Sequence, residues 1–74
     1  MPFYKFTPTD TDYLEFTDVE ADSMEEAPAA LEFELQMHDE FIVKPQADGV
    51  PAVDIFLKGH YLDTLIISEM EPRS

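Results

Sequence analysis

Carboxylates dominate the chemistry that this sequence could perform. The 74 residues contain 17 Asp and Glu against 4 Lys and Arg, and the formal net charge is −13. The densest stretch, DVEADSMEEA (residues 18–27), holds five acids and no base. Twelve acids lie between Lys5 and Lys44, where His38 is the only basic side chain. Paired carboxylates could act as general acid and base, but in so acidic a chain no single pair is informative.

The other residue types give no catalytic or metal-binding constellation. The chain has no cysteine, which excludes thiol nucleophiles, thiolate metal sites and disulfides. No serine stands in a G-x-S-x-G sequence, and Gly49 and Gly59 form no phosphate-binding loop. His38 and His60 have acids nearby but are interpreted as solvated surface residues, and DTDYLE lacks the glycine and spacing of an EF-hand. We therefore expect a protein that is not an enzyme, with no catalytic residue, no metal and no cofactor.

Length and composition predict one small domain, residues 1–74. A chain of this size buries only about 60% of its unfolded surface, so its core is thin. The hydrophobic fraction of 45%, with six Phe and three Tyr, is nevertheless typical of a folded protein rather than of an acidic disordered tail. No stretch approaches the roughly 18 apolar residues of a membrane helix, and the N-terminus has no signal-peptide pattern. We expect a cytoplasmic location.

Alternating hydrophobicity and turn residues predict an antiparallel sheet of about five or six short strands. Strands are expected at FYKFTP (residues 3–8), YLEFTDVEA (residues 13–21) and FIVKP (residues 41–45). The alternation slips at Asp18–Val19, which indicates a bulge or a strand end there.

A β-hairpin is the clearest predicted element, in residues 52–68. Its turn is expected at Lys58-Gly59 or Gly59-His60. With the first of these turns, Asp54 would face Asp63 across the strands, where like charges are unfavourable. One face of the hairpin is expected to carry Val53, Ile55, Leu57, Leu62, Thr64 and Ile66.

A short helical segment is expected near residues 23–30. SMEE fits a capping box with Ser23 as N-cap and Glu26 at position N3. Pro28 lies too deep for such a helix, so the segment is either a short turn or a helix that begins afresh with Pro28 in its first turn.

The stretch LEFELQMH, residues 31–38, determines whether the middle of the chain is predicted as a strand or as a helix. Apolar and polar residues alternate strictly there, and the period of two predicts a strand although Leu, Glu and Met favour helices. A helix from Ser23 to Asp39 is the alternative. The predicted fold class is thus α+β and β-dominated, a small antiparallel sheet with one short helical segment. The aromatic residues expected in its core are Phe6, Phe16, Phe33, Phe41 and Phe56.

Several acids stand two positions apart, as in DTD, DVEAD and EFE. Alternate residues of a strand point to one face about 6.6 Å apart, and two phosphate steps of DNA span about 6.8 Å along the axis. An acidic row on a sheet would therefore resemble a row of phosphates and could enter a cationic groove. The predicted partner-binding residues, with Tyr13 as an apolar anchor, are Asp10, Asp12, Tyr13, Glu15, Asp18, Glu20, Asp22, Glu25, Glu26, Glu32 and Glu34.

In size, charge and lack of cysteine, the whole chain resembles the small acidic DNA-mimic inhibitors of phages and mobile elements. These include anti-CRISPR proteins, anti-restriction proteins and uracil-DNA glycosylase inhibitors, which differ in fold among themselves. The resemblance rests on the acid-rich run from Asp10 to Glu40. It implies inhibition of a basic DNA-binding host protein, such as a nuclease, CRISPR effector, restriction enzyme or glycosylase. The charge itself argues against direct binding to nucleic acid or to an anionic membrane.

The abundance of acids is also compatible with roles other than mimicry. The chain could be a small structural, assembly or accessory protein that pairs through an exposed strand edge, with the acids serving solubility. Halophilic adaptation would also give many acids and few lysines, and a minor enzyme or a calcium binder is a further alternative.

Overall fold

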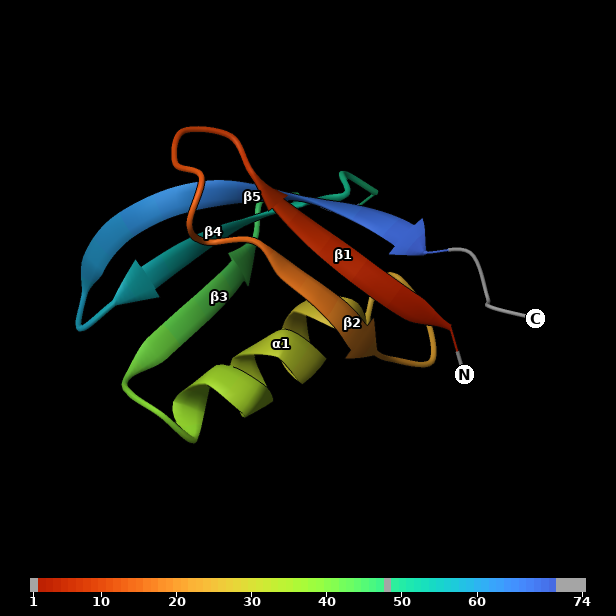
Figure 1. The fold of residues 1–74 in the computed structure, drawn as a ribbon, viewed down its shortest axis with the longest axis horizontal. Helices are drawn as coiled ribbons and strands as arrows, with labels where there is room; N and C mark the ends of the chain where they lie inside the picture. The colour runs from red at the N-terminus through yellow and green to blue at the C-terminus, as the bar shows by residue number, and fades with distance from the viewer. Residues whose placement is uncertain (1, 48, 71–74) are drawn as a thin grey trace.

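The computed structural model describes residues 2–47 and 49–70, which form a five-stranded antiparallel sheet and one helix (Figure 1). The order across the sheet is β2-β1-β5-β4-β3, so that β5, the longest strand, lies in the centre. This confirms the predicted β-dominated α+β class. The elements in chain order are β1 (Phe3–Pro8), β2 (Phe16–Glu20), α1 (Ala27–Gln36), β3 (Phe41–Pro45), β4 (Ala52–Leu57) and β5 (His60–Met70).

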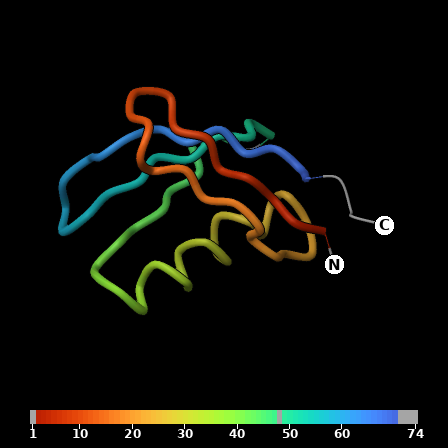
Figure 2. The backbone as a smooth tube through the Cα atoms, in the orientation of Figure 1, coloured from red at the N-terminus to blue at the C-terminus, as the bar shows by residue number. Residues whose placement is uncertain are grey.

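The sheet is curled, and α1 lies across the opening between its two edge strands (Figures 1 and 2). The helix contacts both β2 and β3. The core fills the space between the helix and the inner face of the sheet. Its fully buried side chains include Phe6 from β1, Leu31 from α1, Ile55 from β4 and Leu65 from β5. No helix in the described part of the chain combines the length and the apolar character needed to cross a membrane.

Two strands and one irregularity agree with the sequence prediction. β1 and β3 have the predicted bounds. In β2, Tyr4 pairs with Val19 whereas Phe6 pairs with Phe16, so β2 holds one extra residue opposite β1. Asp18 lies in this bulge with a φ of 58°, in the left-handed region. The predicted slip at Asp18–Val19 is therefore a bulge.

The hairpin turns at Lys58-Gly59, one of the two predicted turns. The φ angles of these residues are 52° and 83°, as a two-residue type I′ turn requires. A second bulge follows in β5: Phe56 pairs with Tyr61, but Ile55 pairs with Asp63.

The bulge makes the predicted hairpin face wrong. Because it inserts one residue, the side chains beyond it change to the other face of the sheet. Leu65 and Ile67 are buried, whereas Ile66 is exposed. Asp54 consequently pairs with Thr64 rather than facing Asp63, so the expected opposition of two carboxylates does not occur.

Residues 31–38 are not a strand, and this prediction is wrong. The alternative, a helix, is correct in kind, and α1 begins at Ala27 and ends at Gln36. The helix buries Ala27 and Leu31 and packs Leu35 partly against the core, at a spacing of four residues. Phe33, predicted in the core, is 68% exposed. The period of two in the sequence therefore reflects apolar residues on both sides of a helix.

The capping box also fails to form. The N-cap of α1 is Glu26, which makes no side-chain cap hydrogen bond. Instead the carbonyl of Ser23 accepts hydrogen bonds from the amides of Glu26 and Ala27, both at 3.1 Å, which makes a turn before the helix. Pro28 lies in the first helical turn, as one of the two predicted alternatives requires.

Candidate functional site

The predicted partner-binding residues fall on four consecutive segments. All of them except Glu32 are exposed, and the side chain of Tyr13 is 79% exposed. Asp10, Asp12, Tyr13 and Glu15 lie in the β1–β2 loop, Asp18 and Glu20 in β2, Asp22, Glu25 and Glu26 before α1, and Glu32 and Glu34 in α1.

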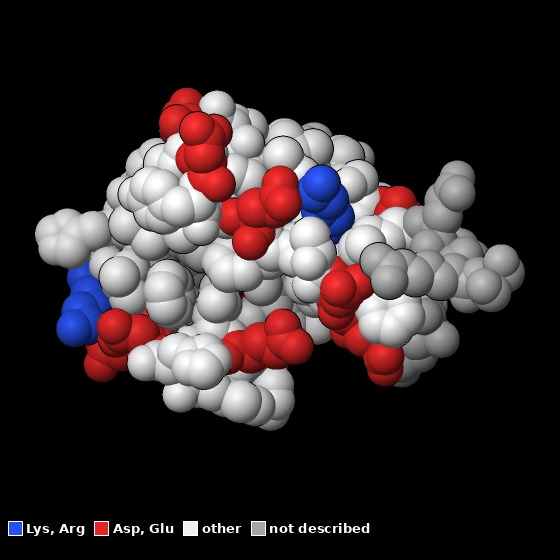
Figure 3. Space-filling model, viewed as in Figure 1, with Lys and Arg blue, Asp and Glu red and all other residues white. Residues whose placement is uncertain are grey.

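The expected phosphate-like row along strands is largely wrong. Asp10 and Asp12 lie in a loop, and Glu32 and Glu34 lie in a helix, where residues two apart point about 200° from each other. Figure 3 accordingly shows separate red patches over this side of the molecule rather than one continuous ridge. The surface is acidic, but its carboxylates have no regular pitch.

Lysines neutralise few of these acids. Lys5 lies 3.8 Å from the Glu15 carboxylate, and Lys58 lies 3.9 Å from Asp39. Both pairs are well exposed, so each contributes little to stability. These are the two ion pairs found among the described residues.

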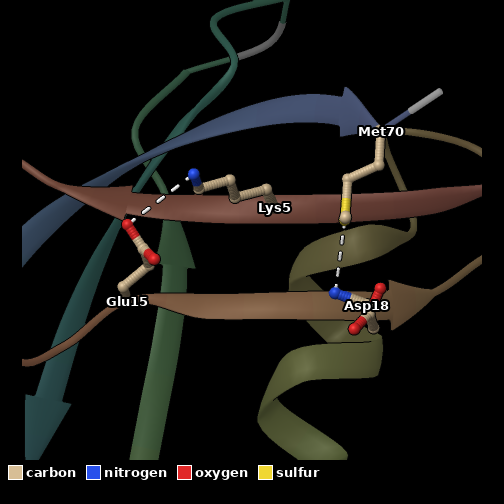
Figure 4. A network of polar contacts seen from close by, with 4 residues as sticks. All are labelled: Lys5, Glu15, Asp18 and Met70. Atoms are coloured by element: carbon tan, nitrogen blue, oxygen red, sulfur yellow. Dashed lines mark hydrogen bonds and ion pairs between the residues drawn. The ribbon is translucent and has the colours of Figure 1, made fainter.

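The bulge at Asp18 in β2 is held by a side chain from β5, as Figure 4 shows. The side chain of Met70, from the end of β5, lies across β1 toward β2, and its sulfur accepts a 3.4 Å hydrogen bond from the Asp18 amide. The amide is thereby satisfied within the protein while the Asp18 carboxylate stays exposed. The Lys5–Glu15 pair lies farther along β1, where Glu15 directly precedes β2.

Asp63 positions the β1–β2 loop, a role that sequence reasoning missed. Its carboxylate is fully buried. One oxygen accepts from the amides of Asp10, at 3.1 Å, and Thr64, at 2.6 Å, and lies 3.2 Å from the Thr9 hydroxyl. The other accepts from the amide and the hydroxyl of Thr11, at 2.9 and 2.8 Å. A lone acid inside the apolar run YLDTLII was the available signal, because a buried carboxylate needs such donors.

The protonation of Asp63 follows from these contacts. Burial, the largest single effect, would raise the pKa of the carboxyl group. The hydrogen bonds from Thr11, Thr64 and Asp10 together outweigh burial and lower the pKa to about 2. Asp63 is therefore ionised at neutral pH and is an acceptor only. Both of its oxygens are engaged by residues 9–11 and by the Thr64 amide.

Glu32 is committed to the fold as well. Its carboxylate accepts a 2.8 Å hydrogen bond from the amide of Val43 on the outward edge of β3. On the same edge, the Gln36 side chain donates to the Phe41 carbonyl at 3.3 Å, and Pro45 has no N–H to offer. Glu32 is thus not a free partner-binding group, and α1 covers the β3 edge.

The outer face of the sheet, turned away from α1, differs sharply in charge. In the described parts of β1, β3, β4 and β5, the carboxylate on this face is Asp54, which accepts hydrogen bonds from Gln46 at 3.0 Å and Thr64 at 2.8 Å. Lys5 and Lys44 also lie on this face. The exposed acids therefore concentrate around β2, its flanking loops and α1.

Neither a metal nor a small-molecule site stands out in the described residues. No group of three or more His, Asp and Glu side chains is arranged there to hold a metal ion. An open hollow of about 530 Å³ lies between the start of α1 and the β3–β4 loop, and Glu25 is the one charged residue among those described in its lining. Comparisons of the chain with models of protein families, with curated proteins and with solved structures find no match.

Proposed function

We propose that this protein is a DNA-mimic inhibitor. It binds the nucleic-acid groove of a basic DNA-binding protein in the cytoplasm and excludes DNA from that groove. The observation that carries this proposal is the segment from Asp10 to Glu40. It contains twelve carboxylates, of which all but Glu32 are exposed. Lysines pair with two of them in the described structure.

The electrostatics favour a cationic protein as partner. Unneutralised acids repel one another and lower the stability of the compact state. Lysine and arginine side chains of a nucleic-acid groove would remove this repulsion on binding, and the field would speed association. DNA and anionic lipids would add to the repulsion instead. Because the acids form patches without a regular pitch, the mimicry lies in charge density and not in a copy of the phosphate spacing.

The acidic loop is also fixed before it meets a partner. The hydrogen bonds of Asp63 hold the backbone from Thr9 to Thr11, next to Asp12 and Tyr13. A surface that is already ordered loses less conformational entropy on binding. This favours a binding role for the loop over a purely solubilising one.

The uneven charge also argues against halophilic adaptation. Acids that serve to hold water in high salt would be expected over the whole surface. The outer face of β1, β3, β4 and β5 carries Asp54 together with Lys5 and Lys44. The exposed acids of the described residues are therefore concentrated on β2, its flanking loops and α1 rather than spread over the whole surface.

Pairing through a strand edge, the alternative function, is confined to β2. Every amide on the outward edge of β3 has a partner or is a proline nitrogen: the Phe41 amide donates to Asp39 and the Val43 amide to Glu32. The β2 edge is five residues long and interrupted by the Asp18 bulge, which is how natural sheets discourage pairing.

The decisive experiment measures DNA binding by candidate targets. A panel of a Cas9-type nuclease, a uracil-DNA glycosylase and a type I restriction enzyme is titrated with this protein while binding of a labelled duplex is followed by fluorescence anisotropy. For at least one enzyme, the apparent Kd for DNA should rise in proportion to the concentration of the protein. If every enzyme keeps its DNA affinity at saturating protein, the proposal is wrong.

A matched pair of variants tests the acidic surface itself. Asp18→Asn with Glu20→Gln removes two charges from β2, and Asn tolerates the left-handed backbone of position 18. Asp54→Asn with Glu69→Gln removes two charges outside the Asp10–Glu40 segment, and Asn at position 54 keeps the oxygen that accepts from Gln46 and Thr64. The first variant should weaken inhibition roughly tenfold at low salt and the second much less. Edge pairing through β2 predicts little change for either variant.

A further inference from the structure

A stripe of exposed apolar side chains runs along α1 to its C-cap, and its members are Ala29, Phe33 and the C-cap residue Met37. Phe33 and Met37 are each 68% exposed, and neither belongs to the core cluster. They stand four residues apart, so their side chains lie on the same helix surface. The stripe is about 12 Å long at 1.5 Å per residue.

The stripe faces away from the rest of the molecule. At 100° per residue, its three members fall within an arc of about 80°, opposite Leu31 and Leu35, which pack against the core. An amphipathic helix normally places charged or polar residues on this side. Two large apolar side chains there break the local pattern without stabilising the fold, and such violations concentrate at functional sites.

Acids surround the stripe. Glu26 precedes it by one turn, Glu34 lies beside it on the helix, and Asp39 and Glu40 follow its end. All four are exposed. In Figure 3, white atoms over α1, at the bottom of the view, lie among separate red patches. The helix therefore presents an apolar ridge inside an acidic frame.

This combination identifies the chemistry of the occupant. A second copy of the chain would bring another net charge of −13 against the same frame, which disfavours self-association. Anionic lipid and nucleic acid are disfavoured for the same reason. The occupant that fits is a protein groove with an apolar floor, which would contact the apolar stripe, and with Lys and Arg at its rim, which would pair with the surrounding acids.

We propose that the outward face of α1 is a docking helix, which inserts Phe33 and Met37 into an apolar groove with a basic rim on the partner protein. Helix-in-groove recognition uses anchors at this spacing. Phe and Met in a desolvated groove supply binding energy that charge alone does not, while the acidic frame orients the helix. The inference rests on the proposed function and deepens it: charge brings the protein to DNA-binding proteins in general, and the ridge selects the one whose groove fits.

The test replaces the anchors without disturbing the fold. Phe33→Gln with Met37→Gln keeps long, helix-forming side chains and the net charge. Because both side chains are mostly exposed, the urea midpoint should not fall. Affinity for the enzyme of the panel that the wild type inhibits, measured by calorimetry, should fall about 30-fold or more, the loss typical of two anchor residues.

Two further variants test whether a loss of affinity comes from these two anchors or from a general loss of exposed apolar surface. Phe33→Leu with Met37→Leu keeps the ridge apolar and should retain affinity within about threefold. Val50→Thr with Ile66→Thr removes exposed apolar surface elsewhere, at residues that are 46% and 43% exposed, and should leave affinity unchanged. An equal loss in this control would assign the effect to general hydrophobicity and overturn the inference.

The outcomes separate the inference from the function on which it rests. If the wild type displaces DNA and the Asp18/Glu20 variant weakens it, but the Phe33/Met37 variant binds normally, the docking helix is wrong and the DNA mimic stands. If no enzyme of the panel is inhibited, both fall together. Sedimentation equilibrium gives the last outcome: a wild-type dimer that the Phe33/Met37 variant dissociates would make a second copy the occupant and overturn the inference.

Discussion

The carboxylate of Asp63 in β5 accepts hydrogen bonds from both the amide and the hydroxyl of Thr11, 52 residues earlier in the chain. This contact joins the central strand to the acidic β1–β2 loop. The loop carries Asp10, Asp12 and Tyr13 at the surface, yet its backbone is anchored to a fully buried group. Asp63 thus stabilises the backbone of the loop, while Asp10 and Asp12 of that loop remain exposed.

Replacement of Asp63 by Asn should destabilise the fold by about 3 kcal/mol. The Asn side chain would point an NH₂ group at donors that now bind an anion, and each unsatisfied buried group costs about 1–3 kcal/mol. Urea unfolding followed by circular dichroism measures the loss. Thr11→Ala is a milder variant, because it removes only the hydroxyl donor and should cost about 1 kcal/mol. Equal midpoints for all three proteins would contradict the structural role of Asp63.

The contribution of Asp63 should disappear in acid. Its pKa lies at about 2 in the folded state, below the ordinary value of 3.8, so the folded protein holds the ionised form more strongly than the unfolded chain does. The stabilisation is complete above about pH 5 and is lost as the pH falls from about 4 through 2. The difference in unfolding free energy between wild type and Asp63→Asn should narrow over that range. A difference that stays constant down to about pH 2 would show that the carboxyl group does not titrate as described.

Gly59→Ala should destabilise the hairpin by about 1 kcal/mol. No atom lies within 4 Å of the position a methyl group would take, so the cost is that of a left-handed backbone at φ 83°. In a domain of this size the melting temperature should fall by about 4–8 °C. Lys58→Asn is the control, because Asn favours the φ of 52° there and the exposed ion pair with Asp39 contributes little. It should melt no lower than the wild type.

Glu32→Ala should open the β3 edge. The Val43 amide would lose its charged acceptor, which should cost about 1.5 kcal/mol, and an unpaired strand amide invites pairing with another chain. Light scattering of concentrated solutions should show association that the wild type lacks. Glu34→Ala removes the same charge from the same helix at an exposed position and should stay monodisperse. Association of both variants alike would point to charge and not to the edge.

Salt should act on the fold and on its complex in opposite directions. Raising NaCl from about 0.1 to about 1 M shortens the screening length from about 10 to about 3 Å. Repulsion among the acids weakens, so the free protein should gain roughly 1 kcal/mol of stability, and the Asp18→Asn, Glu20→Gln variant should gain less. The complex with a target enzyme should weaken over the same range. A complex indifferent to salt would argue against an acidic interface.

Those parts of the sheet that depend on local sequence signals could be predicted. The parts that depend on packing between distant residues could not. β1, β3 and the Lys58-Gly59 turn follow from alternation and glycine, which are local. The bulge after Tyr61 leaves no mark in the sequence, yet it reverses the predicted faces of β5 from Asp63 onward. Exposed Phe33 in α1 and Met37 at its C-cap complete a period of two that resembles the pattern of a strand. The segment forms a helix, as its Leu and Glu residues favour. Leu31 and Leu35 are enough to give that helix a face that packs against the core.

For the candidate site, the charge was predictable but its arrangement was not. Exposure of the acids follows from their number and from the scarcity of lysine. Which acid would be held by the fold depends on contacts between distant residues: Asp63 binds the loop at Thr11, and Glu32 binds Val43 of β3. Neither contact has a local signal.

The central place of β5 has a consequence for synthesis on the ribosome. β5 is the last strand in chain order, yet it pairs with both β1 and β4 and supplies Asp63. While the earlier strands emerge, no strand joins the β1–β2 pair to the β3–β4 pair, and the loop at Thr9–Thr11 lacks its Asp63 anchor. Completion of the sheet and ordering of the loop therefore occur in one late step, after β5 has left the exit tunnel.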